Sequence, residues 1–458
     1  MPLIVSISGI RGVFGDGLSP DTLVTYASAY GSWLRERAKR QPTVVVGRDG
    51  RVTGEVCSRI VTATLQSVGC HVIDAGLATT PTVEMAVLKT EADGGIILSA
   101  SHNPAEWNAL KLLNERGEFL SAADGQAVID RAESGDDFTV AYDQIGAYRE
   151  ADFLSYHIER ILALPYIDPE QIAARDFHIV VDGINSVGGI ALPALLEALG
   201  VKKANIHLVN GEPTGRFAHP AEPLPEHLEE TTQIVADTGA DLGLVVDPDA
   251  DRLALITEGG TFFGEEKTQV VAADFLMRKQ PGPFATNLSS SRLIEDVMAR
   301  YDQPVHRSAV GEVNVVEAMR EHDAVLGGEG NGGVILPALH YGRDALAGAA
   351  MVLQFLAETG NSLSEIGADY PEYHISKNKL SLDGLDADEV LGALAERYAD
   401  ERISTVDGVK IDFDEGWVHL RTSNTEPILR IYTEARTRDE AEALAERFKR
   451  ELREVAPA

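Results

Sequence analysis

A run of small polar residues follows an apolar stretch early in the chain. Residues 96–98, Ile-Ile-Leu, are typical of the end of a buried strand, and residues 99–104 are Ser-Ala-Ser-His-Asn-Pro. Loops at the strand ends of α/β sheets often carry catalytic groups, and here the hydroxyl of Ser101 stands beside the imidazole of His102. The alternative is an ordinary Ser/Asn-Pro turn that only ends the strand.

Three aspartates alternate after another apolar stretch. Residues 242–246 are Leu-Gly-Leu-Val-Val, and Asp247, Asp249 and Asp251 follow, with Arg252 next. Buried carboxylates without partners are costly, so this cluster indicates a bound cation, and oxygen ligands favour Mg²⁺ or Ca²⁺. A calcium EF-hand is rejected because Arg252 stands where that loop needs glycine. Three carboxylates leave an octahedral Mg²⁺ short of ligands, so we expect a substrate or phosphate to complete its shell.

Two glycine-rich segments carry single polar groups. Arg11 lies in Ser-Gly-Ile-Arg-Gly (8–12), where its guanidinium suits a phosphate oxyanion. Glu329 and Asn331 lie in Gly-Gly-Glu-Gly-Asn-Gly-Gly (327–333), where they suit the vicinal hydroxyls of a sugar. Each segment is also compatible with a simple turn.

A polar loop near the C-terminus carries two arginines. Residues 421–427 are Arg-Thr-Ser-Asn-Thr-Glu-Pro, and Arg430 follows. Two guanidinium groups beside hydroxyls and an amide predict a phosphate-binding site. The predicted ligand groups are Arg421, Ser423, Asn424, Thr425 and Arg430. The alternative is a surface β-turn with salt-bridged arginines.

Strands, small-residue loops and helices repeat along the chain, which predicts an α/β fold of three similar domains with mixed sheets. The expected strands are at 43–47, 71–74, 178–182, 206–209, 284–287 and 304–307. The expected helices are at 23–38, 55–68 and 190–199, and a further helix follows residues 289–291 and ends at 301. We interpret the segment from Lys111 to Arg149 as polar and helical. Strands at 409–413, 417–421 and 428–434, between helices at 387–399 and 438–451, predict a smaller C-terminal α+β domain after a linker at 370–388.

Composition restricts the function. The net charge of −32 argues against nucleic acid as a partner, because phosphate backbones need a basic surface. It also requires any phosphate site to be a local basic pocket. We hypothesise that the acidity suits a salty cytoplasm, which requires stability and activity to rise towards molar salt.

The setting is predicted to be cytoplasmic. No apolar run approaches a membrane span, and the N-terminus lacks the features of a signal peptide. The chain has 2 cysteines, Cys57 and Cys70, which suggests a reducing compartment, and neither has a metal-ligand spacing.

Taken together, the motifs SGIRG, SASHNP, DPDADR, GEGNGG and RTSNTEP, in this order, resemble the α-D-phosphohexomutase superfamily over the whole chain. The resemblance implies four domains around a central cleft. We expect them at 1–149 (phosphoserine loop), 150–255 (metal loop), 256–370 (sugar-specificity loop) and 371–458 (phosphate-binding loop). It further implies a hexose phosphate as substrate, a hexose bisphosphate as intermediate, and a monomer or dimer.

The resemblance also assigns roles to residues. Ser101 matches the phosphorylated serine, which together with Asp247, Asp249 and Asp251 binds Mg²⁺. The other matched catalytic residues are Arg11 and His102 of the phosphoserine site, Lys111 for proton transfer, and Arg252 after the metal loop. Glu329 matches the glutamate that binds sugar hydroxyls, with Asn331 beside it, and the Arg421–Arg430 loop matches the site of the non-reacting phosphate.

One motif departs from the common pattern. Many members have Glu-x-Ser-Gly-His in the sugar loop, whereas this chain ends that segment with Gly333, which has no group for acid/base chemistry. The GEGNGG form resembles an archaeal-type subgroup of phosphoglucosamine mutases. We therefore predict interconversion of glucosamine 6-phosphate and glucosamine 1-phosphate. The alternatives are phosphomannomutase/phosphoglucomutase activity, a Mg²⁺-dependent sugar phosphatase and a non-catalytic sugar-phosphate sensor; intact Ser101, Lys111 and the aspartates argue against the sensor.

Overall fold

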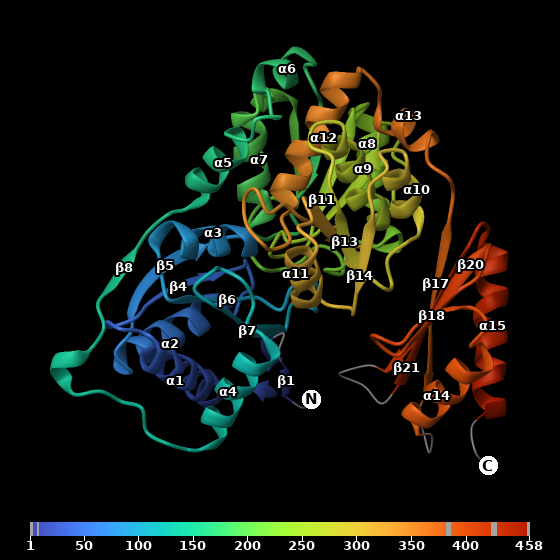
Figure 1. The fold of residues 1–458 in the computed structure, drawn as a ribbon. Helices are drawn as coiled ribbons and strands as arrows, with labels where there is room; N and C mark the ends of the chain where they lie inside the picture. Colours follow the sequence, from blue (N-terminus) through green and yellow to red (C-terminus); the bar gives the residue numbers. More distant parts are fainter. Residues whose placement is uncertain (1–2, 7–8, 382–385, 423–427, 456–458) are drawn as a thin grey trace. The chain divides into compact units, whose positions relative to one another are not determined.

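The computed structural model describes residues 3–6, 9–381, 386–422 and 428–455. It contains two compact units (Figure 1): the first unit is residues 1–279 with 331–367, and the second unit is residues 280–330 with 368–458. The SASHNP loop and the three aspartates therefore belong to the first unit, and Glu329, Arg421 and Arg430 belong to the second.

The larger sheet of the first unit is mixed, in the order β1-β2-β7-β6-β4-β5-β8 with β3 beside β2. Its strands are β1 (Ile4–Ser6), β2 (Gly9–Phe14), β3 (Gly17–Leu18), β4 (Thr43–Arg48), β5 (His71–Leu77), β6 (Gly94–Leu98), β7 (Trp107–Leu113) and β8 (Tyr148–Glu150). β6 and β7 are antiparallel neighbours, with Ile97 opposite Lys111. The loop between these two strands carries Ser101, so the serine and Lys111 come from adjacent strands.

Helices cover both faces of this sheet (Figure 1). They are α1 (Pro20–Arg37), α2 (Gly54–Ser67), α3 (Thr80–Thr90) and α4 (Ala122–Glu133). Val44 and Val46 pack in the core beneath α1, α2 and α4, whereas Val45 packs with α3. Since successive strand residues point to opposite faces, a strand buried on both sides is apolar throughout, which is why the valine run was recognisable in the sequence.

One expectation for this region is wrong, and one helix was not predicted. The segment after Lys111 is not all helical: β7 continues to Leu113, and a helix begins only at Ala122. β7 is buried over nearly its whole length, so its apolar residues belong to the sheet. The helix that was not predicted is α3, whose first turn is capped by the side chain of Thr79 and contains Pro81, both common at helix starts.

The second sheet of the first unit has the order β10-β9-β11-β12. Its strands are β9 (Ile179–Asp182), β10 (Ile206–Val209), β11 (Leu242–Val246) and β12 (Leu253–Thr257). β11 and β12 are antiparallel, so the loop that joins them, 247–252, presents the three aspartates at one end of a buried hairpin.

The rest of the first unit is mainly helical. The helices are α5 (Leu154–Leu162), α6 (Pro169–Ala174), α7 (Gly188–Ala198), α8 (Glu229–Thr238), α9 (Glu265–Met277), α12 (Ala345–Thr359) and α13 (Leu363–Ala368), and the short strand β16 is Gly333–Ile335. α12 is buried from Ala345 to Leu356 and contacts α6, α7 and α9. The segment just before α12 is therefore fixed against the core.

In the second unit, β13 (Phe284–Asn287) pairs in parallel with β14 (Val305–Ser308) and with β15 (Leu326–Glu329), beside α10 (Leu293–Ala299) and α11 (Glu312–Glu321). An antiparallel sheet follows, in the order β17-β21-β20-β19-β18, with α14 (Ala387–Arg397) and α15 (Arg438–Val455). Its strands are β17 (His374–Ser381), β18 (Arg402–Ser404), β19 (Val409–Asp412), β20 (Gly416–Thr422) and β21 (Ile428–Ala435). The interpretation of 370–388 as a linker is corrected, since β17 is the edge strand of this sheet.

The architecture is thus α/β with mixed sheets and a smaller C-terminal part built on an antiparallel sheet, as the sequence predicted. Within the described ranges, no helix is both long and apolar enough to cross a membrane.

Candidate active site

Ser101 lies in a buried turn directly after β6. Its backbone φ is +47°, in the left-handed region that is unusual for a residue other than glycine. The backbone and the side chain of Ser101 are each held by one hydrogen bond: its backbone N–H donates to Oγ of Ser99 at 2.9 Å, and Oγ of Ser101 donates to Oδ2 of Asp247 at 2.7 Å. The unusual backbone conformation aims the hydroxyl at the aspartate loop.

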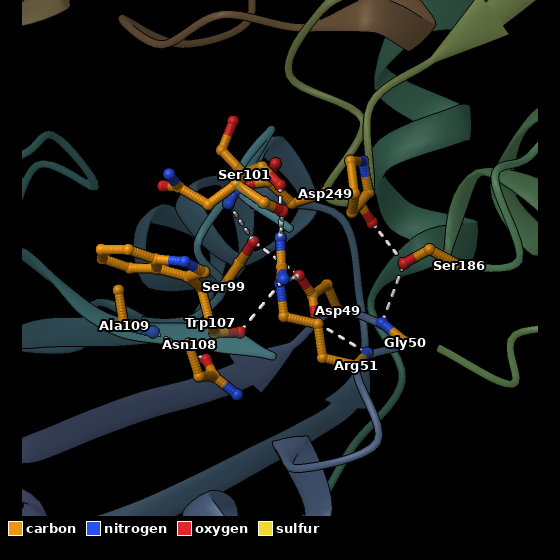
Figure 2. A network of polar contacts seen from close by, with 12 residues as sticks. Asp49, Gly50, Arg51, Ser99, Ser101, Trp107, Asn108, Ala109, Ser186 and Asp249 are labelled. Atoms are coloured by element: carbon orange, nitrogen blue, oxygen red, sulfur yellow. Dashed lines mark hydrogen bonds and ion pairs between the residues drawn. The ribbon is translucent and has the colours of Figure 1, made fainter. Parts of the chain in front are cut away.

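The turn is held by a buried arginine that follows β4 (Figure 2). Arg51 pairs with Asp49 through Nε at 3.0 Å, and its guanidinium donates to the backbone carbonyls of Ser101 at 2.6 Å and Trp107 at 3.0 Å. It also donates to the carbonyls of Asn103 and Pro104. Because guanidinium donors have a fixed planar geometry, this single side chain determines the shape of the whole serine loop.

Ser186 joins this region to the aspartate loop. Its Oγ accepts a hydrogen bond from the backbone N–H of Gly50 at 2.9 Å (Figure 2). The same Oγ donates to the carbonyl of Pro248 at 2.5 Å. The serine loop and the aspartate loop are therefore connected through a buried hydroxyl as well as through the direct bond from Ser101 to Asp247.

Asp247, Asp249 and Asp251 are fully buried, and one carboxylate oxygen of each lies within 4.8 Å of the others. Oδ1 of Asp247 accepts the backbone N–H groups of Asp251 and Arg252, each at 3.1 Å. Oδ1 of Asp249 and Oδ1 of Asp251 are buried and have no hydrogen-bond partner among the described residues. Buried carboxylate oxygens without partners, close together, are the donor set that a hard divalent cation prefers, so the site suits a metal ion.

The other oxygens of the triad are bound by side chains of the first unit. Oδ2 of Asp249 accepts hydrogen bonds from Nζ of Lys111 at 2.7 Å and from Oγ1 of Thr80 at 2.6 Å. Oδ2 of Asp251 lies 2.8 Å from a guanidinium nitrogen of Arg343 and 3.6 Å from Nζ of Lys111. These bonds leave the Oδ1 atoms of Asp249 and Asp251 available to a ligand.

The carboxyl groups titrate differently because their neighbours differ. Burial, followed by the charges of Asp251 and Asp249, holds the pKa of Asp247 well above its usual value. Burial would also raise the pKa of Asp249, but the ammonium of Lys111 outweighs it and holds that pKa below its usual value. Burial likewise opposes the charge on Lys111, and Asp249 and Asp251 overcome it, so the pKa of Lys111 is raised and the group keeps its proton.

Several cations surround His102. Arg252 is the main cause that lowers the pKa of His102 to about 2, followed by burial and then by Arg11, Arg343 and Lys111. Burial is also the first cause of the lowered pKa of Arg11, with Arg252 next. A neutral imidazole among four basic side chains, beside three carboxylates, forms the local basic environment that a phosphate requires in this acidic protein.

In the second unit, Glu329 lies at the end of β15 and is 3% exposed. Its Oε1 accepts a hydrogen bond from Nδ2 of Asn287 at 2.9 Å, and the backbone N–H of Gly330 donates to Oγ of Ser290 at 3.1 Å. Asn331 is the first residue of the segment 331–367, which belongs to the first unit. Its Oδ1 accepts a hydrogen bond from the backbone N–H of Gly333 at 3.2 Å.

Arg421 and Arg430 face each other across β20 and β21 as direct antiparallel partners. Like charges directly opposite are destabilising, so a shared anion would relieve this pair. Nε of Arg421 is buried and has no hydrogen-bond partner among the residues that the structure describes. The other predicted ligands of this loop, Ser423, Asn424 and Thr425, lie outside the described residues.

Three residues around the aspartates were missed by the sequence analysis. Arg343 and Thr80 reach the aspartates, and Arg51 reaches the serine loop, from segments far from the motifs. Nothing local in the sequence marks Arg343 or Thr80, whereas Arg51 lies in the polar segment that follows the apolar strand β4.

Comparisons with known proteins identify the family of the chain. Four models of the phosphoglucomutase/phosphomannomutase family match the chain in order: alpha/beta/alpha domain I at residues 3–138, domain II at 155–260, domain III at 265–373 and the C-terminal domain at 379–451. Together they span most of the sequence.

Individual relatives carry related names. A phosphoglucomutase/phosphomannomutase of Thermococcus kodakarensis is 37% identical over 94% of both chains. A phosphoglucosamine/phosphogalactosamine mutase of Sulfurisphaera tokodaii is 31% identical over 98% of this chain and 99% of its own. The crystal structure of a phosphoglucomutase/phosphomannomutase family protein from Burkholderia thailandensis superposes with a TM-score of 0.85, at 24% identity, over 99% of this chain and 98% of that one, and so shares the fold.

Proposed function

The chain belongs to the phosphoglucomutase/phosphomannomutase family and is a phosphohexomutase, an isomerase, and from this premise we propose that Ser101 carries the phosphoryl group that is transferred. The observation behind the proposal is the 2.7 Å hydrogen bond from Oγ of Ser101 to Oδ2 of Asp247. A phosphate on this oxygen lies beside the aspartates and within the field of the cations around His102.

The buried aspartates suit a metal ion, and we propose that the ion is Mg²⁺, held by Asp247, Asp249, Asp251 and an oxygen on Ser101. When bound there, Mg²⁺ supplies positive charge that offsets the charge of the phosphoryl group in the transition state. Arg11, Arg252 and Lys111 supply the remaining positive charge. The role of the protein in this reaction is to align the reactants and to neutralise charge.

The reaction consists of two transfers. In the first, the bond between Oγ of Ser101 and phosphorus breaks, and a hydroxyl of the hexose phosphate forms a new bond to that phosphorus, which yields a hexose bisphosphate. In the second, Oγ of Ser101 forms a bond to the phosphorus of the other phosphate, the bond from that phosphorus to its sugar oxygen breaks, and the isomeric hexose monophosphate leaves with a free hydroxyl. Each time, the attacking hydroxyl loses a proton and the leaving oxygen gains one. We propose that Lys111, which is protonated beside Asp249, gives its proton to the leaving oxygen and takes up the proton of the attacking hydroxyl, so that it ends each transfer protonated.

Binding of the substrate is assigned to separate groups. We propose that Glu329 and Asn331 bind sugar hydroxyls, and that Arg421 and Arg430, with Ser423, Asn424 and Thr425, bind the phosphate that is not reacting. The facing guanidinium groups of Arg421 and Arg430 support the latter role. We also retain as proposals the domain boundaries at 149/150, 255/256 and 370/371 and a cytoplasmic setting.

The proposed substrate pair is glucosamine 6-phosphate and glucosamine 1-phosphate. The GEGNGG segment and the similarity to a phosphoglucosamine/phosphogalactosamine mutase support it. A second candidate, glucose or mannose phosphate, is favoured by the greater identity to a phosphoglucomutase/phosphomannomutase. Glucose, mannose and glucosamine share the configuration of the 3- and 4-hydroxyls, so selection between them depends on contacts at the 2-position.

The deciding experiment compares kcat/KM for the 6-phosphates of glucosamine, glucose and mannose under one set of salt and Mg²⁺ conditions. Glucosamine phosphate is expected to lead. A lead of more than about tenfold for glucose or mannose phosphate, ~1.4 kcal/mol in transition-state binding, establishes the second candidate instead. Release of inorganic phosphate without isomerisation would identify a phosphatase.

A further inference from the structure

Arg343 reaches the aspartate triad from a segment outside the sequence motifs. It precedes α12, is 8% exposed, and one of its guanidinium nitrogens lies 2.8 Å from Oδ2 of Asp251. Its backbone runs antiparallel to β16: Arg343 forms an isolated bridge with Ile335, and the N–H of Asp344 donates to the carbonyl of Val334 at 2.8 Å. β16 and the segment before α12 therefore form one small unit of structure.

The stem of Arg343 occupies the space over Gly333. A Cβ atom placed on Gly333 would lie 2.3 Å from Cδ and 2.9 Å from Cγ of Arg343, closer than real Cβ contacts. The φ of Gly333 is outside the left-handed region, so the backbone itself would accept a side chain. The glycine is thus required by the arginine, which gives a physical reason for the departure of this segment from Glu-x-Ser-Gly-His.

The residue after Arg343 is fixed by a buried network. Oδ2 of Asp344 lies 2.8 Å from Nε2 of His157 and 3.3 Å from Nε2 of His340. Oδ1 of Asp344 accepts the backbone N–H groups of Leu346 and Ala347 at the start of α12. The backbone of Arg343 is thus held beside β16, its stem packs over Gly333, and its guanidinium extends from there to Asp251.

We propose that Gly333 and Arg343 form one positioning pair for the metal loop: the missing side chain at position 333 lets Arg343 hold Oδ2 of Asp251, which leaves Oδ1 turned toward the metal ion. The inference rests on the proposed function, because it gives Asp251 the same role as a ligand. Oδ1 of Asp251 is buried without a hydrogen-bond partner among the described residues, and its nearest cationic group is Nε of Arg252 at 3.8 Å, beyond hydrogen-bond distance, so this oxygen can still accept a metal ion. Arg343 acts through Asp251 and is therefore a positioning residue.

A double-mutant cycle tests the pair. The wild type, Gly333→Ala, Arg343→Gln and the double variant are stripped of metal, and their dissociation constants for Mn²⁺ are measured by electron paramagnetic resonance, together with kcat/KM and the melting temperature. Each single variant is expected to lose roughly 10–100-fold in Mn²⁺ affinity, the range for partners that orient metal ligands. The double variant should lose no more than Arg343→Gln alone, because the alanine acts only by displacing the arginine.

Two controls separate the pair from general damage. Gly259→Ala places a methyl group where no atom lies within 4 Å, and its Mn²⁺ affinity should equal that of the wild type. Arg343→Lys keeps a cation on a flexible stem and should recover part of the affinity lost in Arg343→Gln.

The possible outcomes are distinct. Additive losses in the cycle, or unchanged Mn²⁺ affinity in Arg343→Gln with the fold intact, overturn the positioning pair. If the wild type itself binds no divalent metal, the proposed metal site fails, and the pair fails with it. Equal loss of affinity in Gly333→Ala and Gly259→Ala would show that the effect is not specific to Arg343, which also overturns the inference.

Discussion

Oγ of Ser101 lies 2.7 Å from Oδ2 of Asp247, although 146 positions separate the two residues in the sequence. The contact joins the end of β6 to the loop between β11 and β12, so two sheets of the first unit each contribute one half of the proposed phosphoryl site.

The first prediction is that Ser101→Ala lowers mutase turnover by several orders of magnitude, because the oxygen that carries the phosphoryl group is removed. The melting temperature should change little, since one hydrogen bond contributes about 1 kcal/mol. Ser99→Ala is the matched control: it removes the hydroxyl that accepts the N–H of Ser101 but leaves the nucleophile, and should retain far more activity. Near-normal turnover in Ser101→Ala would exclude the phosphoserine mechanism.

The second prediction concerns the metal. Asp247→Asn and Asp251→Asn should each weaken Mg²⁺ binding and lower turnover, because an amide is a poorer ligand than a carboxylate for a hard cation. The measurement is the Mg²⁺ dependence of kcat/KM after treatment with a chelator. Full activity of the wild type in excess chelator would contradict the assignment.

The third prediction is that Arg51→Met destabilises the fold by about 3–5 kcal/mol, the cost of breaking a buried ion pair, because Asp49 and several backbone carbonyls lose their partner. Chemical denaturation measures this change. Arg48→Met, at a half-buried arginine of the same segment, should cost much less. Comparable losses in the two variants would mean that the carbonyl contacts of Arg51 contribute nothing beyond packing of its stem.

The fourth prediction concerns Arg421. Arg421→Ala should raise KM for the hexose phosphate by roughly 10–150-fold, which corresponds to the 1.5–3 kcal/mol of a charge-assisted hydrogen bond. The melting temperature should stay the same or rise, because repulsion from Arg430 on the facing strand disappears. Arg402→Ala, at an exposed arginine of β18, is the control. An unchanged KM would place the phosphate elsewhere.

The fifth prediction is a pH dependence of stability from His340. Burial opposes its charge, but Asp344 and Glu84 on either side outweigh it and raise the pKa of His340 to about 10, above the roughly 6.5 of an unfolded histidine. The stabilisation is therefore complete below about pH 6.5 and is lost as the pH rises toward 10.

Denaturation of the wild type and His340→Gln across this range checks the sign. The difference in unfolding free energy between them should shrink as the pH rises. The other groups of this network are His157, Glu84 and Asp344. Burial raises the pKa of Glu84. Burial would also raise the pKa of Asp344, but the two histidines outweigh it and lower that pKa. A difference that does not change with pH would show that His340 is neutral in the folded protein.

Sequence reasoning found the features that are encoded locally. The apolar run of β4 and the alternation of Asp247, Asp249 and Asp251 after β11 lie in short windows, so each could be interpreted without tertiary contacts. β17 was mistaken for a linker because an edge strand with a partly exposed, polar sequence lacks an apolar run. β7 was not predicted, and its last residues were assigned to a polar helical segment that begins at Lys111.

The contacts that complete the site were not predictable in this way. Arg343 and Thr80 reach the aspartates only through tertiary packing, and their own neighbours in the sequence give no sign of it. The roles of Ser101, Lys111 and the other matched residues remain predictions. The family and the α/β architecture with its antiparallel C-terminal part are confirmed by the family models and by the sheets.

The burial of Arg51 has a consequence for how this protein can change over generations. Arg51 holds the serine loop and also pairs with the buried carboxylate of Asp49. A substitution that changed one of these roles would therefore impair the other. Selection for a more heat-tolerant protein and selection for a faster one both act on the same codon and favour the same residue. Variation should therefore accumulate around position 51, at sites such as the exposed Val52, and spare the arginine itself.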